Sequence, residues 1–150
     1  ARVPEAIPSL LFVCVENSNR SQMAEGFARL HGAGQVEAYS SGSRPSGVVN
    51  PKAIAAMKEK GVDLTVHQSK SLDDLPDVEW EWAVTMGCGD ECPMIKARHR
   101  TDWALPDPKH MEPEKFNEVR DEIERRVLDL QDRDQGGVRA AAGHRPRPRR

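Results

Sequence analysis

The sequence predicts one α/β domain of three layers, in which a four-stranded parallel sheet is flanked by helices on both faces. Short apolar segments alternate with amphipathic segments along the chain, and this order builds a parallel sheet covered on both sides. A length of 150 residues suits a single domain. The last amphipathic segment is long and repeats its apolar residues at intervals of three and four, as a helix packed on a core does.

The first half of the chain contains two strand–helix units. Asn50 is a favourable N-cap, Pro51 suits the first helical turn, and Gly61 can end that helix. The predicted elements are, in order, a strand at 10–15, a helix at 21–30, a strand at 36–41 and a helix that starts at Asn50-Pro51.

The second half contains two further strands and a long helix. The predicted elements are a helical turn at 72–75, strands at 80–86 and 98–103, and a helix at 112–130. The apolar face of that helix is formed by Phe116, Val119, Ile123, Val127 and Leu130. Its period fixes which side faces the sheet.

The charge of the chain divides it into a domain at residues 1–135 and a tail at 136–150. The tail holds five Arg and no acid, so the domain carries 17 basic and 24 acidic residues, a net charge of −7. Because the tail is rich in Gly, Pro and Arg and lacks an apolar period, it is predicted to be disordered. A basic tail could bind an acidic partner, but no nucleic-acid partner is expected.

The composition also bounds the cellular setting. No apolar run is long enough to span a membrane, and the first residues lack the layout of a signal peptide. Three cysteines, an odd number in loop-like positions, favour a reducing compartment over a disulfide scaffold. We therefore expect a cytoplasmic monomer without membrane contact.

The stretch from Cys14 to Ser21 carries the chemistry of the chain. It joins an apolar strand to an amphipathic helix and has the pattern Cys-x5-Arg-Ser. A strand that turns into a helix in this way directs backbone N–H groups at one point, which suits a tetrahedral oxyanion. The residues expected to surround that anion are Val15, Glu16, Asn17, Ser18, Asn19, Arg20 and Ser21.

Cys14 would lie under such an anion as a thiolate. The helix N-terminus and the nearby Arg20 are expected to favour the charged form of the thiol. Ser21 can donate a hydrogen bond to the sulfur, and Asn17 can take a left-handed conformation or tie the loop through its amide. The alternative is a buried cysteine that only fills the core.

A second pair of cysteines, Cys88 and Cys92, follows the strand at 80–86. Three interpretations remain open. The two thiols could form a redox pair that exchanges electrons with Cys14, they could bind zinc with His99 and His110, or they could have no role. No metal site is predicted, because no second close pair of ligands follows.

In combination, these motifs resemble the thioredoxin-coupled arsenate reductases, which share their fold with the low-molecular-weight protein tyrosine phosphatases. The similarity includes Cys14-x5-Arg20-Ser21, the segment 22–26, the Cys88/Cys92 pair and the segment 102–108. It extends over about residues 9–130. Asp107-Pro108 in the last segment is also a common turn pair, and Asp102 is a rival acid.

The resemblance implies a reaction and its residues. Cys14 attacks arsenate, while Arg20 and the loop amides hold the oxyanion and Asp107 protonates the departing oxygen. Cys88 then attacks Cys14 and arsenite leaves. Cys92 attacks Cys88, and the resulting disulfide passes to thioredoxin or a low-molecular-weight thiol. Phosphate and sulfate act as analogues of arsenate, and no cofactor is required.

Two other functions remain possible on the sequence. A phosphatase would use Cys14, Arg20 and Asp107 in the same roles, but it would not need the second cysteine pair, and the segment 109–111 lacks paired aromatic residues. A sensor would bind the anion without turnover. The sequence departs from the better-known reductases at Glu16, a carboxylate beside an anion site, and at Asn19, where several relatives have cysteine.

Overall fold

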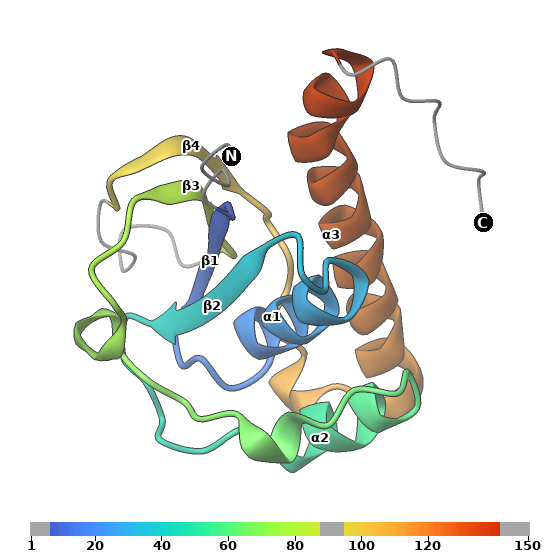
Figure 1. Ribbon diagram of the computed structural model, residues 1–150. Coiled ribbons are helices and arrows are strands. Elements are labelled where there is room, and N and C mark those ends of the chain that lie inside the picture. The colour runs from blue at the N-terminus through green and yellow to red at the C-terminus, as the bar shows by residue number, and fades with distance from the viewer. Residues whose placement is uncertain (1–6, 88–94, 142–150) are drawn as a thin grey trace.

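The computed structural model describes residues 7–87 and 95–141, with residues 133–141 as backbone only. Its four strands form one parallel sheet in the order β2-β1-β3-β4 (Figure 1). The strands are β1 (Ser9–Cys14), β2 (Glu37–Gly42), β3 (Trp80–Thr85) and β4 (Ala97–Asp102). The predicted four-stranded parallel sheet is confirmed, and each strand bound lies within one residue of its expected position.

The strand order creates a crevice at the carboxyl end of β1. The chain passes from β1 to β2 on one side, and β3 then pairs with β1 on the other side. Cys14 pairs in register with Gly42, and Val13 pairs with Thr85. The carboxyl ends of three strands therefore meet around Cys14, and open α/β sheets bind ligands at such a point of reversal.

Three α-helices pack on one face of the sheet. They are α1 (Arg20–His31), α2 (Pro51–Lys58) and α3 (Pro113–Ala141), and α1 and α3 run side by side (Figure 1). The side chain of Asn50 accepts a hydrogen bond of 2.9 Å from the Lys52 N–H, so the predicted cap of α2 is confirmed. All five predicted apolar residues of α3 are buried in the core below it.

The two faces of β1 enter two separate clusters. Leu10, Phe12 and Cys14 point toward the three helices, whereas Leu11 and Val13 point to the opposite face. There the described cover consists of Trp80, Ile95 and partly buried residues such as Leu72 of the 3-10 helix η2 (Leu72–Asp74). Every residue of β1 is buried, which fixes the position of the loop that follows it.

Helix α3 extends past the expected domain boundary. It continues through Ala141, so residues 136–141 are helical where the composition predicts disorder. The reason is that an existing helix adds residues without a further nucleation cost, and Arg139, Ala140 and Ala141 are good helix formers. Residues 142–150 lie outside the described part. Among the described residues, no helix has both the length and the apolar character required to cross a bilayer.

Candidate active site

The loop between β1 and α1 turns its carbonyl groups outward. Each carbonyl from Cys14 to Asn19 accepts a hydrogen bond from a group outside the loop's concave side. The donors are Ser43 N to Cys14 O (3.1 Å), Arg44 N to Val15 O (2.8 Å), Ser46 N to Glu16 O (3.0 Å), Gln22 Nε2 to Asn17 O (3.2 Å), Asn50 N to Ser18 O (3.1 Å) and Met23 N to Asn19 O (2.9 Å).

This arrangement directs the amides of the loop inward. In a planar trans peptide the N–H points opposite to the carbonyl that precedes it. With the carbonyls of residues 14–18 held outward, the N–H groups of residues 15–19 turn toward the inside of the loop. The N–H of Asn17 shows this directly, because it donates to Cys14 Sγ at 3.3 Å. Such a ring of N–H groups can bind an anion.

A chain of hydrogen bonds defines the donor to Cys14. The Oδ1 atom of Asn17 accepts from the backbone N–H of Lys70 at 2.9 Å, so the Asn17 Nδ2 group faces the other way and donates to Ser21 Oγ at 2.8 Å. Ser21 Oγ lies 2.9 Å from Cys14 Sγ. Because the hydroxyl oxygen already accepts from Asn17, its proton is free to point at the sulfur and stabilise a thiolate.

Both predicted roles of Asn17 are therefore observed. Its φ is 52°, in the left-handed region, and its side-chain amide ties the loop to Ser21 and to Lys70. Gln22 adds a further tie, because its Nε2 also donates to Asn17 Oδ1 at 2.9 Å. Cys14, Asn17 and Ser21 are all buried, which excludes water from the hydrogen bonds between them.

Gly42 lies directly behind the loop and allows its close approach to β2. A Cβ atom at this position would lie 2.6 Å from Val15 O and 2.9 Å from Asn17 N. Both atoms belong to backbone, so the loop itself would have to move. No residue larger than glycine fits here without displacing the amides.

We expect Gly42→Ala to lower the affinity for phosphate more than tenfold and the free energy of unfolding by about 1–3 kcal/mol. Isothermal titration with phosphate and urea unfolding measure the two effects. Gly34→Ala is the matched control: its φ of 77° strains any larger residue, but its Cβ meets nothing within 4 Å. If both variants lose stability and only Gly42→Ala loses affinity, the displaced loop is the cause; unchanged affinity in Gly42→Ala contradicts it.

The side chain of Arg20 is buried and joins three segments. Its Nη1 donates to Met86 O at 2.5 Å and to Leu105 O at 3.0 Å, and its Nη2 lies 3.9 Å from Asp107 Oδ2. These contacts hold the guanidinium beside the loop from the first turn of α1. The structure therefore brings Cys14, Arg20 and Asp107, which are far apart in sequence, to one edge of the sheet.

Asp107 has both of the roles that its sequence context suggests. Its Oδ1 accepts from the Lys109 N–H at 3.1 Å and caps the 3-10 helix η4 (Pro108–His110), so it is a turn former. Its side chain is also 43% exposed beside Arg20, where it can exchange a proton with solvent or ligand. The rival Asp102 instead accepts from Thr85 Oγ1 and Gly87 N at the end of β3, which is a structural role.

One charged group near the loop, Lys109, was missed by sequence reasoning. The Nζ atom of Lys109 lies 3.1 Å and 3.3 Å from the two carboxylate oxygens of Glu16. Behind the loop, the buried Glu25 accepts from Ser40, pairs with Arg29 at 2.6 Å and lies 3.7 Å from Lys70 Nζ. The signal for Lys109 was its position two residues after Asp107, whereas for Glu25 the local sequence marks the i,i+4 pair with Arg29 but not the contacts with Ser40 and Lys70.

His67 supports the loop as a neutral ring. Burial lowers the pKa of His67 from its usual 6.5, more than the nearby Glu25 raises it. The His67 Nδ1 lies 2.9 Å from Gln22 Oε1 and donates to it, because the Gln22 Nε2 group faces Asn17. The ring thereby fixes the Gln22 amide, which in turn holds Asn17.

Cys88 and Cys92 lie outside the described residues, so their predicted roles are not tested by the structure. The zinc alternative also depends on them. Of its other two ligands, His99 stacks on Trp82 with ring centroids 4.7 Å apart at the β4 edge, and His110 lies in η4. Among the side chains that the structure describes, in residues 7–87 and 95–132, no three of His, Cys, Asp or Glu are grouped to hold a metal ion.

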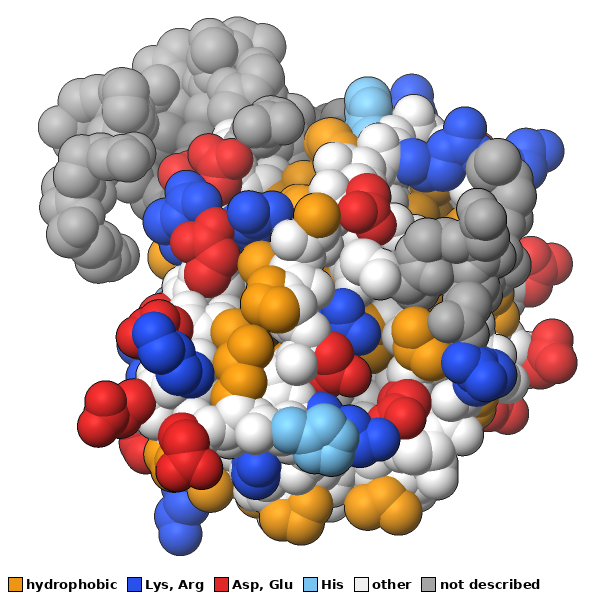
Figure 2. All heavy atoms as spheres, turned by 180° about the vertical axis from the view of Figure 1, so that it is seen from behind, with side chains coloured by type: hydrophobic (Ala, Val, Ile, Leu, Met, Phe, Trp, Pro, Cys, Tyr) orange, Lys and Arg blue, Asp and Glu red, His pale blue; other side chains and the backbone are white. Residues whose placement is uncertain are grey.

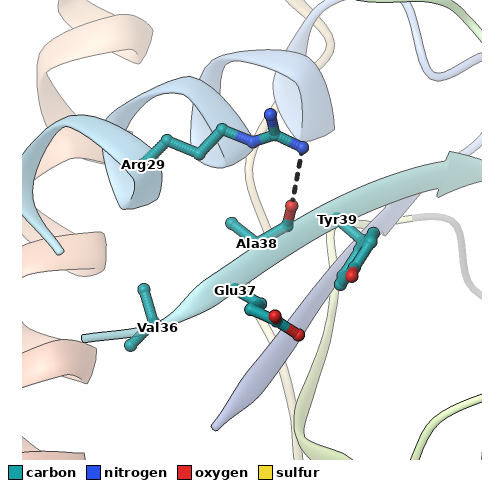
Figure 3. Close-up of a pocket in the computed structure, with 5 residues that line it drawn as sticks. All are labelled: Arg29, Val36, Glu37, Ala38 and Tyr39. Atoms are coloured by element: carbon teal, nitrogen blue, oxygen red, sulfur yellow. Dashed lines mark hydrogen bonds between the residues drawn. The ribbon is translucent and has the colours of Figure 1, made fainter. Parts of the chain in front are cut away.

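The other surfaces offer less chemistry. A shallow depression beside β2 is lined by Arg29, Val36, Glu37, Ala38 and Tyr39, and Arg29 Nη2 donates to Ala38 O at 3.0 Å (Figure 3). This bond protects the exposed edge of the sheet, at the opposite end of β2 from Gly42. Basic and acidic side chains are interspersed over the described part of the face shown in Figure 2.

The fold and the loop together define a class of α/β proteins in which a cysteine lies inside an anion-binding turn at the carboxyl end of the first strand. Comparison with known sequences gives the family. The profile of the low molecular weight phosphotyrosine protein phosphatases matches residues 9–136, and the chain belongs to this family.

Similar proteins in this family are named arsenate reductases. A glutaredoxin arsenate reductase of a Synechocystis species is 37% identical over 81% of this chain and 94% of its own length. An arsenate reductase of Staphylococcus aureus is 40% identical over 77% of this chain and 89% of its own. The solved structure of an arsenate reductase in a phosphate-binding state is 36% identical, with a TM-score of 0.75 over 82% of this chain and 95% of that one.

Two further structures bear on the comparison. The thioredoxin-dependent arsenate reductase of Corynebacterium glutamicum is 30% identical, with a TM-score of 0.72 over 90% of this chain and 65% of that one. A low molecular weight protein tyrosine phosphatase of T. tengcongensis is 23% identical over 84% of this chain and 99% of its own, with a TM-score of 0.72, and shows the same fold.

Proposed function

We propose that this protein is an arsenate reductase, which converts arsenate to arsenite through Cys14, Cys88 and Cys92. The observation that carries the proposal is Cys14, held by the Asn17 N–H and Ser21 Oγ inside an amide-lined loop. Relatives of 37–40% identity over most of the chain are arsenate reductases. The phosphatase alternative shares the loop but gives no role to Cys88 and Cys92.

The first step forms a bond between Cys14 and arsenic. The thiolate of Cys14 attacks arsenate while Arg20 and the inward amides of residues 15–19 stabilise its negative charge. One oxygen leaves as water with a proton from Asp107, whose exposed carboxyl lies beside Arg20. The product is a covalent adduct in which arsenic is still As(V).

The second step transfers two electrons. The Cys88 thiolate attacks Cys14 Sγ, an S–S bond forms, and the As–S bond breaks with its electron pair remaining on arsenic. Arsenite, As(III), leaves. Cys92 then attacks Cys88, which frees Cys14 as a thiolate and leaves a Cys88–Cys92 disulfide for an external dithiol to reduce.

The described residues support delivery of Cys88 to this site. Gly87 directly precedes Cys88, and a Cβ on Gly87 would lie 3.2 Å from Arg20 Nη1. The carbonyl of Met86 accepts from the same nitrogen. Since consecutive Cα atoms are about 3.8 Å apart, the segment that carries Cys88 begins next to Arg20, at the candidate site.

We further propose thioredoxin as the reductant. The C. glutamicum relative is thioredoxin-dependent, and the Synechocystis relative has glutaredoxin in its name, so glutathione with glutaredoxin is the alternative to be assayed in parallel. The protein is proposed to act as a monomer in the cytoplasm, where thiols stay reduced, with residues 1–135 as the catalytic unit.

The test is arsenate-dependent oxidation of NADPH with thioredoxin and thioredoxin reductase. The parent protein turns over, and Cys88→Ser and Cys92→Ser do not, because each lacks one thiol of the relay. Cys92→Ser still releases one arsenite per chain in a single turnover. Hydrolysis of p-nitrophenyl phosphate, which needs neither thiol, is the control. Full arsenate turnover without Cys88 and Cys92 rules out this mechanism.

A further inference from the structure

We propose that Lys109 is the counter-charge of Glu16 and thereby permits the oxyanion loop to bind a dianion despite its own carboxylate. This inference rests on the proposed binding of an oxyanion by the loop, but not on reduction of that anion. Lys109 acts through Glu16, so it is a positioning residue for the loop rather than a catalytic one.

The contact is two-pronged and joins distant segments. Lys109 Nζ lies within 3.3 Å of both carboxylate oxygens of Glu16, and the two residues are 93 positions apart in the chain. The side chains are 42% and 35% exposed, so each is partly shielded from solvent. An ammonium group within hydrogen-bond distance of both oxygens fixes the carboxylate and neutralises its charge.

The backbone of Lys109 is held in place independently of Glu16. Its N–H donates to Asp107 Oδ1 at 3.1 Å, and its carbonyl accepts from Lys52 Nζ at 3.1 Å. Lys52 lies in α2, so the helix layer and the Asp107 turn together fix the root of the lysine side chain. The ammonium group therefore does not depend on the ion pair alone for its position.

The electrostatic need is evident from the loop itself. Glu16 is two residues from Cys14, and its neighbours present amides to a shared centre. A bare carboxylate near that centre repels both the thiolate and a bound dianion, and one unit charge a few ångströms away, partly screened by water, changes affinity by about tenfold. Pairing with Lys109 cancels this charge. Loss of the pair should therefore lower the affinity for the anion more than the stability of the protein.

The experiment measures phosphate binding without turnover. The dissociation constant is taken from protection of Cys14 against iodoacetamide by inorganic phosphate at low salt, in a Cys88→Ser/Cys92→Ser background where Cys14 is the sole thiol. The variants are Lys109→Met, Glu16→Gln and the double substitution. Lys115→Met is the matched control, because it makes the same charge change at an exposed pair with Glu118.

Lys109→Met is expected to weaken phosphate binding about tenfold, whereas the double variant returns to within twofold of the parent and Lys115→Met is unchanged. The melting temperatures are expected to agree within a few degrees. Binding within twofold of the parent in Lys109→Met, or a double variant as weak as Lys109→Met, overturns the inference.

The result separates the inference from the proposed function. If the parent protein binds phosphate and the variants behave as expected, but the parent reduces no arsenate, the proposed reductase function is wrong and the role of Lys109 stands. If the parent protein reduces arsenate but Lys109→Met binds phosphate as tightly as the parent, the role of Lys109 is wrong and the reductase function stands. Failure of phosphate to protect Cys14 in the parent overturns the counter-charge as well, because the loop then binds no dianion.

Discussion

Cys14→Ser is expected to lose arsenate reduction and p-nitrophenyl phosphate hydrolysis together, each by at least about a thousandfold. A serine hydroxyl has nearly the shape of the thiol but stays protonated near neutral pH. The hydrogen bonds from Asn17 N and Ser21 Oγ then surround a neutral oxygen. The side chain is 2% exposed, and the exchange adds no bulk to the core. Initial rates of both reactions measure the loss.

The control for this result is the second cysteine pair. Cys88→Ser should abolish arsenate turnover while it leaves the phosphatase reaction, so the two variants separate the nucleophile from the relay. A thermal unfolding curve close to that of the parent shows that Cys14→Ser is folded. Retention of p-nitrophenyl phosphate hydrolysis in folded Cys14→Ser would falsify the role of this sulfur as the nucleophile.

Arg20→Lys is expected to lower kcat/KM for arsenate by about 10²–10³, which corresponds to about 2.7–4 kcal/mol. Both terminal nitrogens of the guanidinium make contacts: Nη1 donates to Met86 O and Leu105 O, and Nη2 lies near Asp107. An ammonium group keeps the charge but lacks the planar fork, so it cannot hold these carbonyls and two anion oxygens at once. Steady-state kinetics with arsenate measure the effect.

Arg98→Lys is the matched control for that substitution. Arg98 lies on β4 with its side chain 65% exposed, and its pair with Glu81 at 3.7 Å is an ordinary surface contact. Such pairs contribute about 0–1 kcal/mol to stability, so kcat/KM should not change. A rate for Arg20→Lys within tenfold of the parent means that charge alone suffices at this position.

The sequence predicts well those features that depend on neighbouring residues. The apolar period of α3, the cap at Asn50 and the left-handed turn at Asn17 are local properties, and the structure reproduces them. Cys14 was also expected at the end of a strand, and the structure places it there; the strand order, which the sequence analysis did not predict, puts that end at the point where the sheet reverses.

What the sequence does not predict depends on distant contacts. The side-chain contacts of Glu16 with Lys109 and of Glu25 with Ser40 and Lys70 join residues that are 15 or more positions apart, whereas the pair of Glu25 with Arg29 is local. No spacing rule connects such residues. The end of α3 is a different case: Gly136 and Gly137 suggest a break, but the helix propagates through them.

The outward carbonyls of the loop have an evolutionary consequence. The carbonyls of Cys14, Val15, Glu16 and Ser18 are bound by the main-chain N–H groups of the segment 43–50, which any residue except proline can supply. The one proline of this stretch, Pro45, falls at a position that contributes no such donor. Side chains around the mouth can therefore diverge freely between lineages, so entry to the pocket can be retuned for a new anion while its inner geometry is inherited intact.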